Sequence, residues 1–281
     1  MYDSDTQSAI ERAAQIIKSA EALLVAAGAG MGVDSGLPDF RGNEGFWKAY
    51  PPFRRANLTF VDVANPAWFR TKPRQAWGFY GHRLNLYRAT SPHAGFAILK
   101  RWADMKSADA FVFTSNVDGH FQRAGFADDR IIECHGSIHH AQCSQPCFDE
   151  IWQADEIQPT VDETDFQAAE PLPKCPRCEA VARPNILMFG DARWLGSRTD
   201  EQLARYQAWR RSIAGRKLVV VELGAGEAIP TVRHECERAG GTLIRINPRE
   251  PEVPRGGIPI PLGALEALTA IDAAMTGERG T

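Results

Sequence analysis

The sequence predicts an α/β protein built on a doubly wound parallel sheet, with a small metal-binding domain inserted into it. Short apolar segments alternate with helical segments along most of the 281 residues, and this alternation is typical of parallel sheets. The first apolar segment runs into a glycine-rich stretch at residues 28–32, the strand end at which such sheets bind ligands. Two close cysteine pairs interrupt the alternation between residues 143 and 178, which indicates a metal-binding insertion.

The first elements follow from the spacing of apolar side chains. Residues 6–19 carry apolar side chains at helical spacing, and residues 23–27 form a short apolar run bounded by glycine, typical of a buried parallel strand. Residues 43–60 have no clean period, so we expect a mobile loop that can close over a nucleotide. Aromatic side chains at helical spacing over 66–87 line either an apolar tunnel or a core.

The later elements continue the alternation. Ser91 and Pro92 are expected to open a helix over 94–105, because serine is a good N-cap and proline fits the first helical position. The remaining predicted strands are 110–114, 131–133, 217–223 and 242–246, and the remaining predicted helices are 199–213, 228–239 and 262–275. Polar residues follow two of these strands, Ser115 directly after 110–114 and His135 two positions after 131–133.

The glycines after the first strand can form an anion site. Gly28, Gly30 and Gly32 carry no Cβ atoms, so backbone N–H groups can approach a pyrophosphate, and a following helical turn would direct its positive end at that anion. Their spacing is Gly-x-Gly-x-Gly, which differs from the Gly-x-Gly-x-x-Gly fingerprint of dinucleotide-binding folds. A tight glycine-rich turn without a ligand is the alternative.

The two cysteine pairs predict a structural zinc site. Cys143 and Cys147 are separated by three residues, and Cys175 and Cys178 by two. Four thiolates in two such pairs suit tetrahedral Zn²⁺ with no open position for a substrate. The alternative is four unrelated buried cysteines.

Charge and composition limit the partners that we expect. The net charge of −3 gives no general attraction to nucleic acid. The N-terminus is acidic and polar, unlike a secretory signal, and no apolar run approaches the length of about 18 residues that can span a bilayer. We therefore expect a cytoplasmic protein with no nucleic-acid or membrane partner, as a monomer or a small homo-oligomer.

Several motifs, taken together, resemble the sirtuin (Sir2) family of NAD-dependent protein deacylases. They occur in the order of that family over nearly the whole chain, and they are Gly28-Ala29-Gly30, Ser35-Gly36-Leu37-Pro38-Asp39-Phe40-Arg41, Thr114-Ser115-Asn116-Val117-Asp118-Gly119, His135-Gly136 and the two cysteine pairs. The resemblance implies a Rossmann-like NAD-binding domain, residues 1–137 and 183–281, and a zinc-ribbon domain, residues 138–182.

The resemblance also implies roles for individual residues. His135 corresponds to the general base, and Asn116 and Asp118 to catalytic residues at the nicotinamide end of NAD. The residues that correspond to the cofactor-binding set are Gly28, Ala29, Gly30, Asp39, Phe40, Arg41, Ser115, Asn116, Asp118, Gly224, Ala225, Gly226 and Asn247. From the residues alone, Asn116 and Asp118 could instead cap a following helix.

Three positions differ from the usual family pattern. Ser115 stands where the family usually has Gln, which puts a direct contact of this side chain with ribose hydroxyls in doubt. Gly224-Ala225-Gly226 stands in place of Gly-Thr-Ser, so hydroxyl donors are missing there, although backbone N–H groups can still serve. Asp191 replaces a usual Glu.

One residue pair bears on the acyl group. Tyr80 and Arg83 are three residues apart, so they share one helix face. They are similar to the pair that holds a succinyl or malonyl carboxylate in some sirtuins, and Arg can bind a carboxylate bidentately. The alternative is a core tyrosine beside a surface arginine.

The resemblance implies an enzyme that binds NAD and an acylated-lysine protein and releases nicotinamide and O-acyl-ADP-ribose. It implies a deacetylase, with desuccinylase or demalonylase activity as a further option. A Sir2-fold NAD hydrolase or ADP-ribosyltransferase would use the same NAD residues without acyl-lysine, and the departures at Ser115 and residues 224–226 keep this alternative open. A non-catalytic NAD-sensing module is a third possibility.

Overall fold

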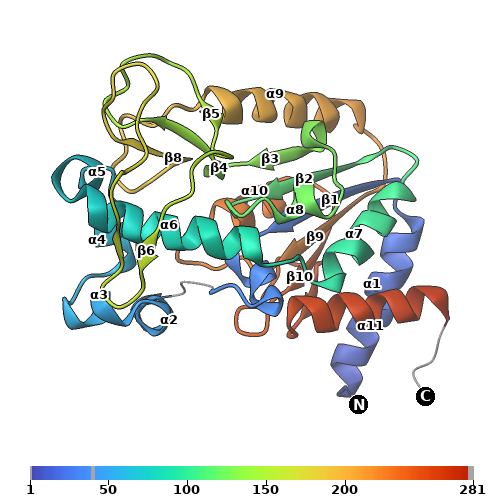
Figure 1. Ribbon diagram of the computed structural model, residues 1–281. Helices are drawn as coiled ribbons and strands as arrows, with labels where there is room; N and C mark the ends of the chain where they lie inside the picture. The colour runs from blue at the N-terminus through green and yellow to red at the C-terminus, as the bar shows by residue number, and fades with distance from the viewer. Residues whose placement is uncertain (1, 39–41, 278–281) are drawn as a thin grey trace.

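The computed structural model describes residues 2–38 and 42–277, and its centre is a six-stranded parallel sheet (Figure 1). The strand order is β11-β10-β9-β1-β2-β3. Neighbouring strands are parallel throughout. The strands are β1 (Ala22–Ala27), β2 (Ala110–Thr114), β3 (Ile131–Glu133), β9 (Leu218–Leu223), β10 (Thr242–Ile246) and β11 (Ile258–Ile260). The predicted α/β fold is thereby confirmed, and β11 is a strand that the sequence analysis missed.

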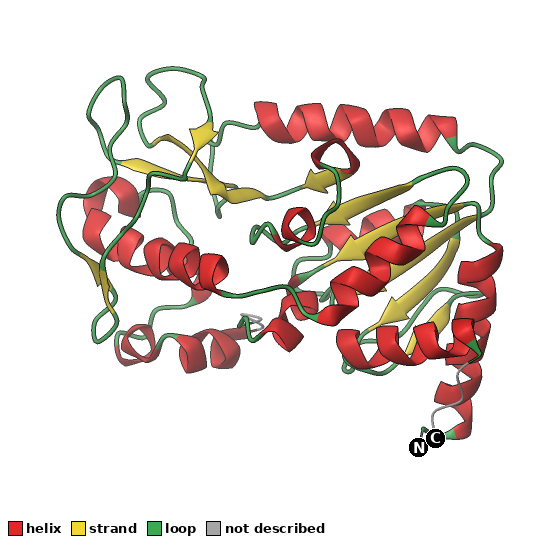
Figure 2. Cartoon of the chain, turned by 45° about the vertical axis from the view of Figure 1, so that its right-hand side comes forward, coloured by secondary structure: helices red, strands yellow, loops and turns green. Residues whose placement is uncertain are grey.

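Helices cover both faces of this sheet (Figure 2). On one face, α1 (Ser4–Ser19), α7 (Ala94–Asp104) and α11 (Ala264–Thr276) pack against alternate strand residues such as Leu23 and Val25. On the other face, α9 (Ser197–Ser212) and α10 (Thr231–Arg238) pack against Leu24 and Ala26. Because β1 is buried on both faces, its continuous apolar sequence is the pattern that a central parallel strand requires.

Residues 43–60 were expected to form a mobile loop, and this prediction is wrong. The segment forms two short helices, α2 (Gly42–Ala49) and α3 (Pro51–Arg55), and a third, α4 (Phe60–Val63), begins at its last residue. The aromatic residues Phe46, Tyr50 and Phe53 are three or four positions apart, which brings their rings into one buried cluster. Packing of these rings stabilises helices that are too short to persist alone.

Two further helices complete this helical region. The helix α5 (Trp68–Thr71) leads into α6 (Pro73–Ala89), whose buried residues join the same aromatic cluster. The next helix, α7, has His93 and not Ser91 as its N-cap, because Nδ1 of His93 accepts a hydrogen bond from Gly95 N at 3.0 Å. The predicted cap was therefore two residues too early. The short helices η1 (Ala29–Ser35), α8 (His120–Arg123) and η2 (Asp128–Arg130) lie in loops that follow or precede strands.

A second, antiparallel sheet lies between β3 and α9 in the chain. Its strands are β4 (Gly136–Cys143), β5 (Trp152–Gln153) and β8 (Ala182–Ile186), in the order β5-β4-β8. A separate hairpin, β6 (Val161–Asp162) and β7 (Gln167–Ala168), lies along α6 in Figure 1.

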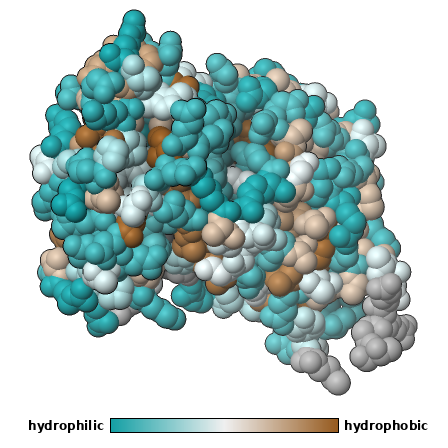
Figure 3. Space-filling model, viewed as in Figure 1, coloured by the Kyte–Doolittle hydropathy of each residue, from teal (hydrophilic) through white to brown (hydrophobic). Residues whose placement is uncertain are grey.

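The outer surface seen in Figure 3 is largely hydrophilic, and apolar residues appear on it in small separate groups. Over the two described ranges, no helix combines the length and apolar character needed to cross a bilayer.

Candidate active site

The candidate site lies where the order of the central sheet reverses. Counted along the chain, the strands have the order 3-2-1-4-5-6, and β1 and β9 are the two neighbours at the reversal. Loops that follow such a pair diverge to opposite faces and leave a crevice in which ligands bind. Gly28 follows β1 and Gly224 follows β9, so both predicted glycine loops meet at this crevice.

The two loops approach so closely that side chains are excluded. Gly30 N donates a hydrogen bond to Gly224 O at 3.0 Å. A Cβ on Gly28 would lie 2.8 Å from Ala225 Cα, and one on Gly224 would lie 2.4 Å from Gly30 Cα. Gly224 also has a φ of +58°, in the left-handed region that favours glycine. The resulting backbone surface, formed by Gly28, Ala29 and residues 224–226, is called the glycine wall below.

A cavity of about 470 Å³ opens beside the glycine wall. This volume is in the range of small-molecule sites, about 300–1,000 Å³. Besides the glycine wall, it is lined by polar residues predicted for the site and by apolar residues of other segments; the polar ones include Ser115, Asn116, Asp118, His135, Tyr80 and Arg83. The fold thus brings segments that are far apart in the sequence around one cavity.

His135 lies at the cavity because the chain turns sharply after β3. Gly136 follows it with a φ of +79°, and a Cβ there would lie 2.1 Å from Asn185 O, so only glycine fits this turn into β4. Burial lowers the pKa of His135 below its ordinary value of 6.5. The imidazole is therefore neutral at physiological pH and can accept a proton.

Asn116 and Asp118 are held by backbone contacts in the loop after β2. Asn116 Nδ2 donates to Gly28 O at 3.0 Å, which ties this loop to the glycine wall. Asp118 Oδ1 accepts from His120 N, the first residue of α8, at 2.9 Å, whereas the N-cap residue of this helix is Gly119. Both residues line the cavity as well. Ser115 lines it beside them, with its backbone N bonded to Ala27 O.

Helix α6 forms the opposite side of the cavity with three polar side chains, Tyr80, Arg83 and Tyr87, here called the α6 wall. Burial raises the pKa of Tyr80 to about 12, so its phenol stays protonated and can donate a hydrogen bond. Burial lowers the pKa of Arg83, but Tyr87, Tyr80 and Tyr50 around it raise the pKa, and the net shift is upward. The α6 wall therefore carries a buried positive charge.

Some predicted residues lie elsewhere. Asn247 is fully buried, where its Nδ2 donates to Ala225 O at 2.9 Å and its Oδ1 accepts from the backbone of Arg249 and Glu250. It therefore supports the glycine wall from behind and does not line the cavity. Gly30 lines a separate cavity of about 90 Å³ with residues that include Pro248. The predicted residues Asp39, Phe40 and Arg41 lie outside the described residues.

Sequence reasoning missed part of the lining. Residues 186–189 form an apolar side of the cavity, and Leu187 and Phe189 are partly exposed there. Asp191 holds this segment through a buried ion pair with Arg183 at 2.7 Å and a contact to Met188 N at 3.4 Å. The apolar run before Asp191 could have indicated this lining, but such a run is also typical of an ordinary buried strand.

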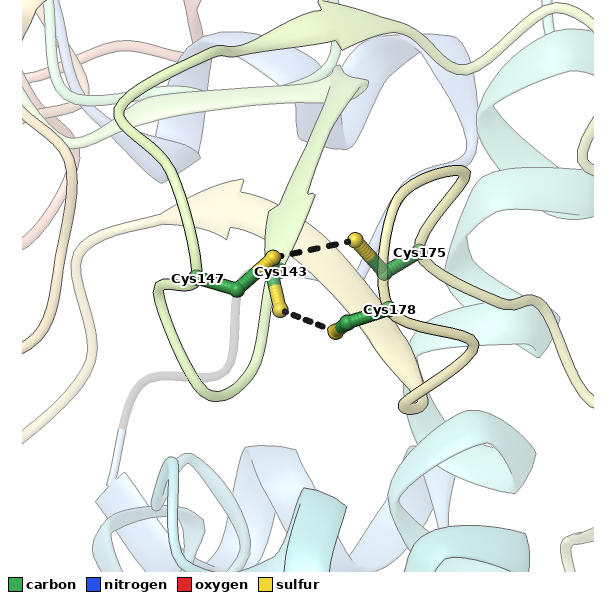
Figure 4. A group of neighbouring side chains, drawn as sticks. All are labelled: Cys143, Cys147, Cys175 and Cys178. Atoms are coloured by element: carbon green, nitrogen blue, oxygen red, sulfur yellow. Dashed lines mark hydrogen bonds between the residues drawn. The ribbon is translucent and has the colours of Figure 1, made fainter.

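The four predicted zinc ligands come together at one end of the small antiparallel sheet (Figure 4). Their sulfur atoms all lie within 4.8 Å of one another. Cys143 and Cys178 Sγ are 3.7 Å apart, and Cys147 and Cys175 Sγ are 3.6 Å apart. Four sulfurs at about 2.3 Å from a tetrahedral Zn²⁺ are about 3.8 Å from one another, so the cluster fits a structural zinc ion.

Comparisons with known proteins agree with this geometry. The model of the Sir2 family matches residues 28–207, more than half of the chain. A protein of Pyrococcus abyssi named NAD-dependent protein deacylase is 30% identical over 245 residues, which cover 86% of this chain and 87% of that protein. A protein of Aeropyrum pernix with the same name is 29% identical over 244 residues, which cover 85% and 86% of the two chains.

Solved structures share the fold. A crystal structure described as a Sir2 homolog–NAD complex superposes with a TM-score of 0.68 at 22% identity, over 96% of this chain and 95% of that one. A Sir2 homologue in complex with ADP-ribose also gives 0.68, at 22% identity over 96% and 99% of the two chains. From the family match, the sequence relatives and the four-cysteine cluster, we conclude that this chain belongs to the Sir2 family.

Proposed function

We propose that the protein is an NAD-dependent protein-lysine deacylase, and that the acyl groups it removes include acidic ones such as succinyl and malonyl. The observation that carries the proposal is a single cavity lined by the glycine wall, by His135 with Asn116 and Asp118, and by the cationic α6 wall. The names of the relatives in Pyrococcus abyssi and Aeropyrum pernix support the NAD-dependent deacylase activity.

The glycine wall fits the phosphates of NAD. Cβ atoms at Gly28 and Gly224 would collide with the facing backbone. A backbone without side chains at these positions can approach a pyrophosphate with its N–H groups. Ala225 and Gly226 lack hydroxyl groups, so the backbone carries this contact. NAD supplies an electrophilic ribose carbon and a leaving nicotinamide.

His135 acts as the general base. Because burial keeps its imidazole neutral, the ring can take the proton of a ribose hydroxyl when the acyl group transfers. Asn116 and Asp118 hold the nicotinamide end of the dinucleotide. The hydrogen bond from Asn116 Nδ2 to Gly28 O fixes the position of Asn116 relative to the glycine wall. Water then releases the free lysine and an O-acyl-ADP-ribose.

The α6 wall selects the acyl group. Arg83 can bind a carboxylate bidentately, and the protonated Tyr80 can add a hydroxyl donor. An uncharged acetyl group offers no carboxylate to these donors, so the α6 wall favours the entry of acidic acyl groups.

Nicotinamide release tests the reaction class. The enzyme is incubated with NAD alone and with acetyl-, malonyl- or succinyl-lysine peptides, and nicotinamide is quantified. We expect release that requires an acyl-lysine peptide. Release that is equally fast without peptide would identify an NAD hydrolase or a transferase, and no release under any condition would favour an NAD-sensing module.

Kinetics of an Arg83→Met variant test the acyl group. Loss of a buried hydrogen-bonded charge partner costs about 2–5 kcal/mol, so we expect a drop in kcat/KM of at least about thirtyfold for succinyl-lysine. The acetyl-lysine value should change little. Arg70→Met removes the same charge at an exposed position of α5 and serves as the control. If all acyl groups lose activity alike, or succinyl-lysine is not processed at all, plain deacetylation is the better assignment.

The domain boundaries, the partner, the location and the oligomeric state also stay proposals. The division into residues 1–137 with 183–281 and residues 138–182 is consistent with the separate small sheet and its cysteine cluster. An acylated-lysine protein is the proposed partner. The cytoplasmic location and the monomeric or small homo-oligomeric state stay predictions.

A further inference from the structure

Tyr87 lies one helical turn after Arg83 on α6, and its hydroxyl is bonded to the guanidinium. The Tyr87 oxygen accepts hydrogen bonds from Arg83 Nε at 3.0 Å and from Arg83 Nη2 at 2.8 Å. Both N–H groups belong to one edge of the planar guanidinium, so a single oxygen holds that edge in place. Both side chains are buried, with 7% of Arg83 and 5% of Tyr87 exposed.

The chemistry of this contact suits a receptor for anions. A buried guanidinium needs acceptors for its N–H groups, since an unmet donor is costly. Burial raises the pKa of Tyr87, although the charge of Arg83 opposes the shift, so the phenol is neutral at physiological pH. The Tyr87 oxygen therefore accepts hydrogen bonds from two N–H groups without adding a negative charge that would repel an acidic ligand.

The Tyr87 ring contributes separately from its hydroxyl. The Arg83 Cζ atom is 5.3 Å from the centre of the Tyr87 ring, 5.3 Å from that of Phe79 and 5.7 Å from that of Tyr80. A phenylalanine at position 87 would keep this cation–π contact and the packing of α6. The change Tyr87→Phe thus removes the hydroxyl that accepts from Arg83 and keeps the ring.

We infer that Tyr87 is a positioning residue that sets the orientation of Arg83 and thereby the selectivity of the site for acidic acyl groups. This inference rests on the proposed function. Tyr87 acts through Arg83, so loss of its hydroxyl should impair substrates with a carboxylate on the acyl group more than acetyl-lysine. A merely structural tyrosine would affect both substrates alike.

The first experiment compares kcat and KM for succinyl- and acetyl-lysine peptides at saturating NAD. A hydrogen bond to a charged group contributes about 1.5–3 kcal/mol, so Tyr87→Phe should raise KM for succinyl-lysine by at least about tenfold. The loss with acetyl-lysine should be smaller, because its acyl group presents no carboxylate to Arg83. Tyr206→Phe is the matched control, because the Tyr206 hydroxyl donates to Glu235 at 2.7 Å from α9, outside the cavity lining.

A double-mutant cycle tests whether Tyr87 acts through Arg83. In an Arg83→Met background, Tyr87→Phe should cause no further loss with succinyl-lysine, whereas independent contributions would add. The Arg83 Nε–H signal in a nitrogen-resolved NMR spectrum gives a readout independent of turnover. It should exchange with solvent slowly in the wild type and faster in Tyr87→Phe.

The outcomes separate this inference from the proposed function. If Arg83→Met lowers succinyl-lysine turnover but Tyr87→Phe behaves like Tyr206→Phe, the role of Tyr87 is overturned and the acidic-acyl proposal stands. If the wild type does not process acidic acyl groups, both are overturned. Equal losses on succinyl- and acetyl-lysine, or additive losses in the double mutant, also overturn the role of Tyr87.

Discussion

The glycine wall and the α6 wall face the same cavity but are built in different ways. The glycine wall is backbone at the ends of adjacent strands, held by sheet-edge hydrogen bonds such as Gly28 N to Leu223 O at 3.0 Å. The α6 wall is made of side chains on one helix, and that helix is positioned by segments distant in the sequence. The first wall depends on backbone contacts between the ends of two adjacent strands, whereas the second depends on side-chain packing of a helix.

The support of the α6 wall comes from the hairpin β6–β7 and the segment before it. Arg88 donates to the backbone oxygens of Ile157 and Ala154 at 2.6 Å each, and Arg74 Nε donates to Ala168 O at 3.0 Å. These acceptors all lie in the chain between the two cysteine pairs. The metal site therefore anchors both ends of the segment that holds α6.

The largest expected effect is loss of the zinc site. Elemental analysis should find one zinc ion per chain, and Cys175→Ser should lower the free energy of unfolding by about 5 kcal/mol or more, because structural zinc contributes folding free energy directly. Because the metal site anchors the segment that supports α6, peptide turnover should fall by a larger factor than the affinity for NAD, which calorimetry measures. Cys236→Ala, a buried thiol outside the cluster, should keep the zinc. A metal-free protein of equal stability would contradict the prediction.

Removal of the general base is expected to have the next largest effect. His135→Ala should reduce deacylation by roughly a hundredfold to ten-thousandfold, the usual contribution of a general base. The variant should remain folded and zinc-loaded, and it should bind NAD and peptide, because the residue belongs to neither wall. Steady-state kinetics with circular dichroism test this. Near-normal turnover would remove His135 from the mechanism.

A smaller effect is expected from crowding the glycine wall. Gly224→Ala places a Cβ 2.4 Å from Gly30 Cα at a φ of +58°, and we expect a loss of about 2–4 kcal/mol in stability with weaker NAD binding. Gly240→Ala is the matched control, since Gly240 has a φ of +73° with nothing within 4 Å of its Cβ position. It should lose only about 1 kcal/mol in thermal unfolding. Equal losses in the two variants would show that the close approach is unimportant.

The mildest prediction is a pH dependence. The neutral form of His135 is the active base, and its pKa lies below 6.5 because of burial. The kcat/KM of the deacylation should therefore reach a plateau with respect to this group at neutral and higher pH, and fall by up to about tenfold per unit as the pH decreases through the lowered pKa. An acid limb with a midpoint above 6.5 would contradict the burial argument.

Much of the central sheet could be predicted because its signals are local. The strands β2, β3 and β10 coincide with the predicted ranges, since a short apolar run bounded by polar or glycine residues is sufficient to identify a buried strand. The cysteine spacing likewise predicted a cluster that the structure assembles. The short helices α2 and α3 could not be predicted, because contacts among their aromatic rings and with distant residues stabilise them.

Long-range contacts decided what the walls look like. Phe166 stacks edge-on against Tyr50 with ring centres 4.8 Å apart, although 116 residues separate them in the sequence. Asn247 was predicted to bind the cofactor, and in the structure a hydrogen bond from its side chain to Ala225 O supports the glycine wall. The spacing of apolar residues does not predict such contacts, because it describes only residues that are near one another along the chain.

By itself, the sequence determined the alternation of strands and helices, the glycine loops, the metal ligands and the position of His135 shortly after a strand. Each of these depends on residue types within a few positions of one another. Only the tertiary structure decided that Arg83 is buried with the hydroxyl of Tyr87 against its guanidinium, and that both line the same cavity as His135. The physical reason is that burial and charge at a site depend on packing between segments, which a local pattern does not specify.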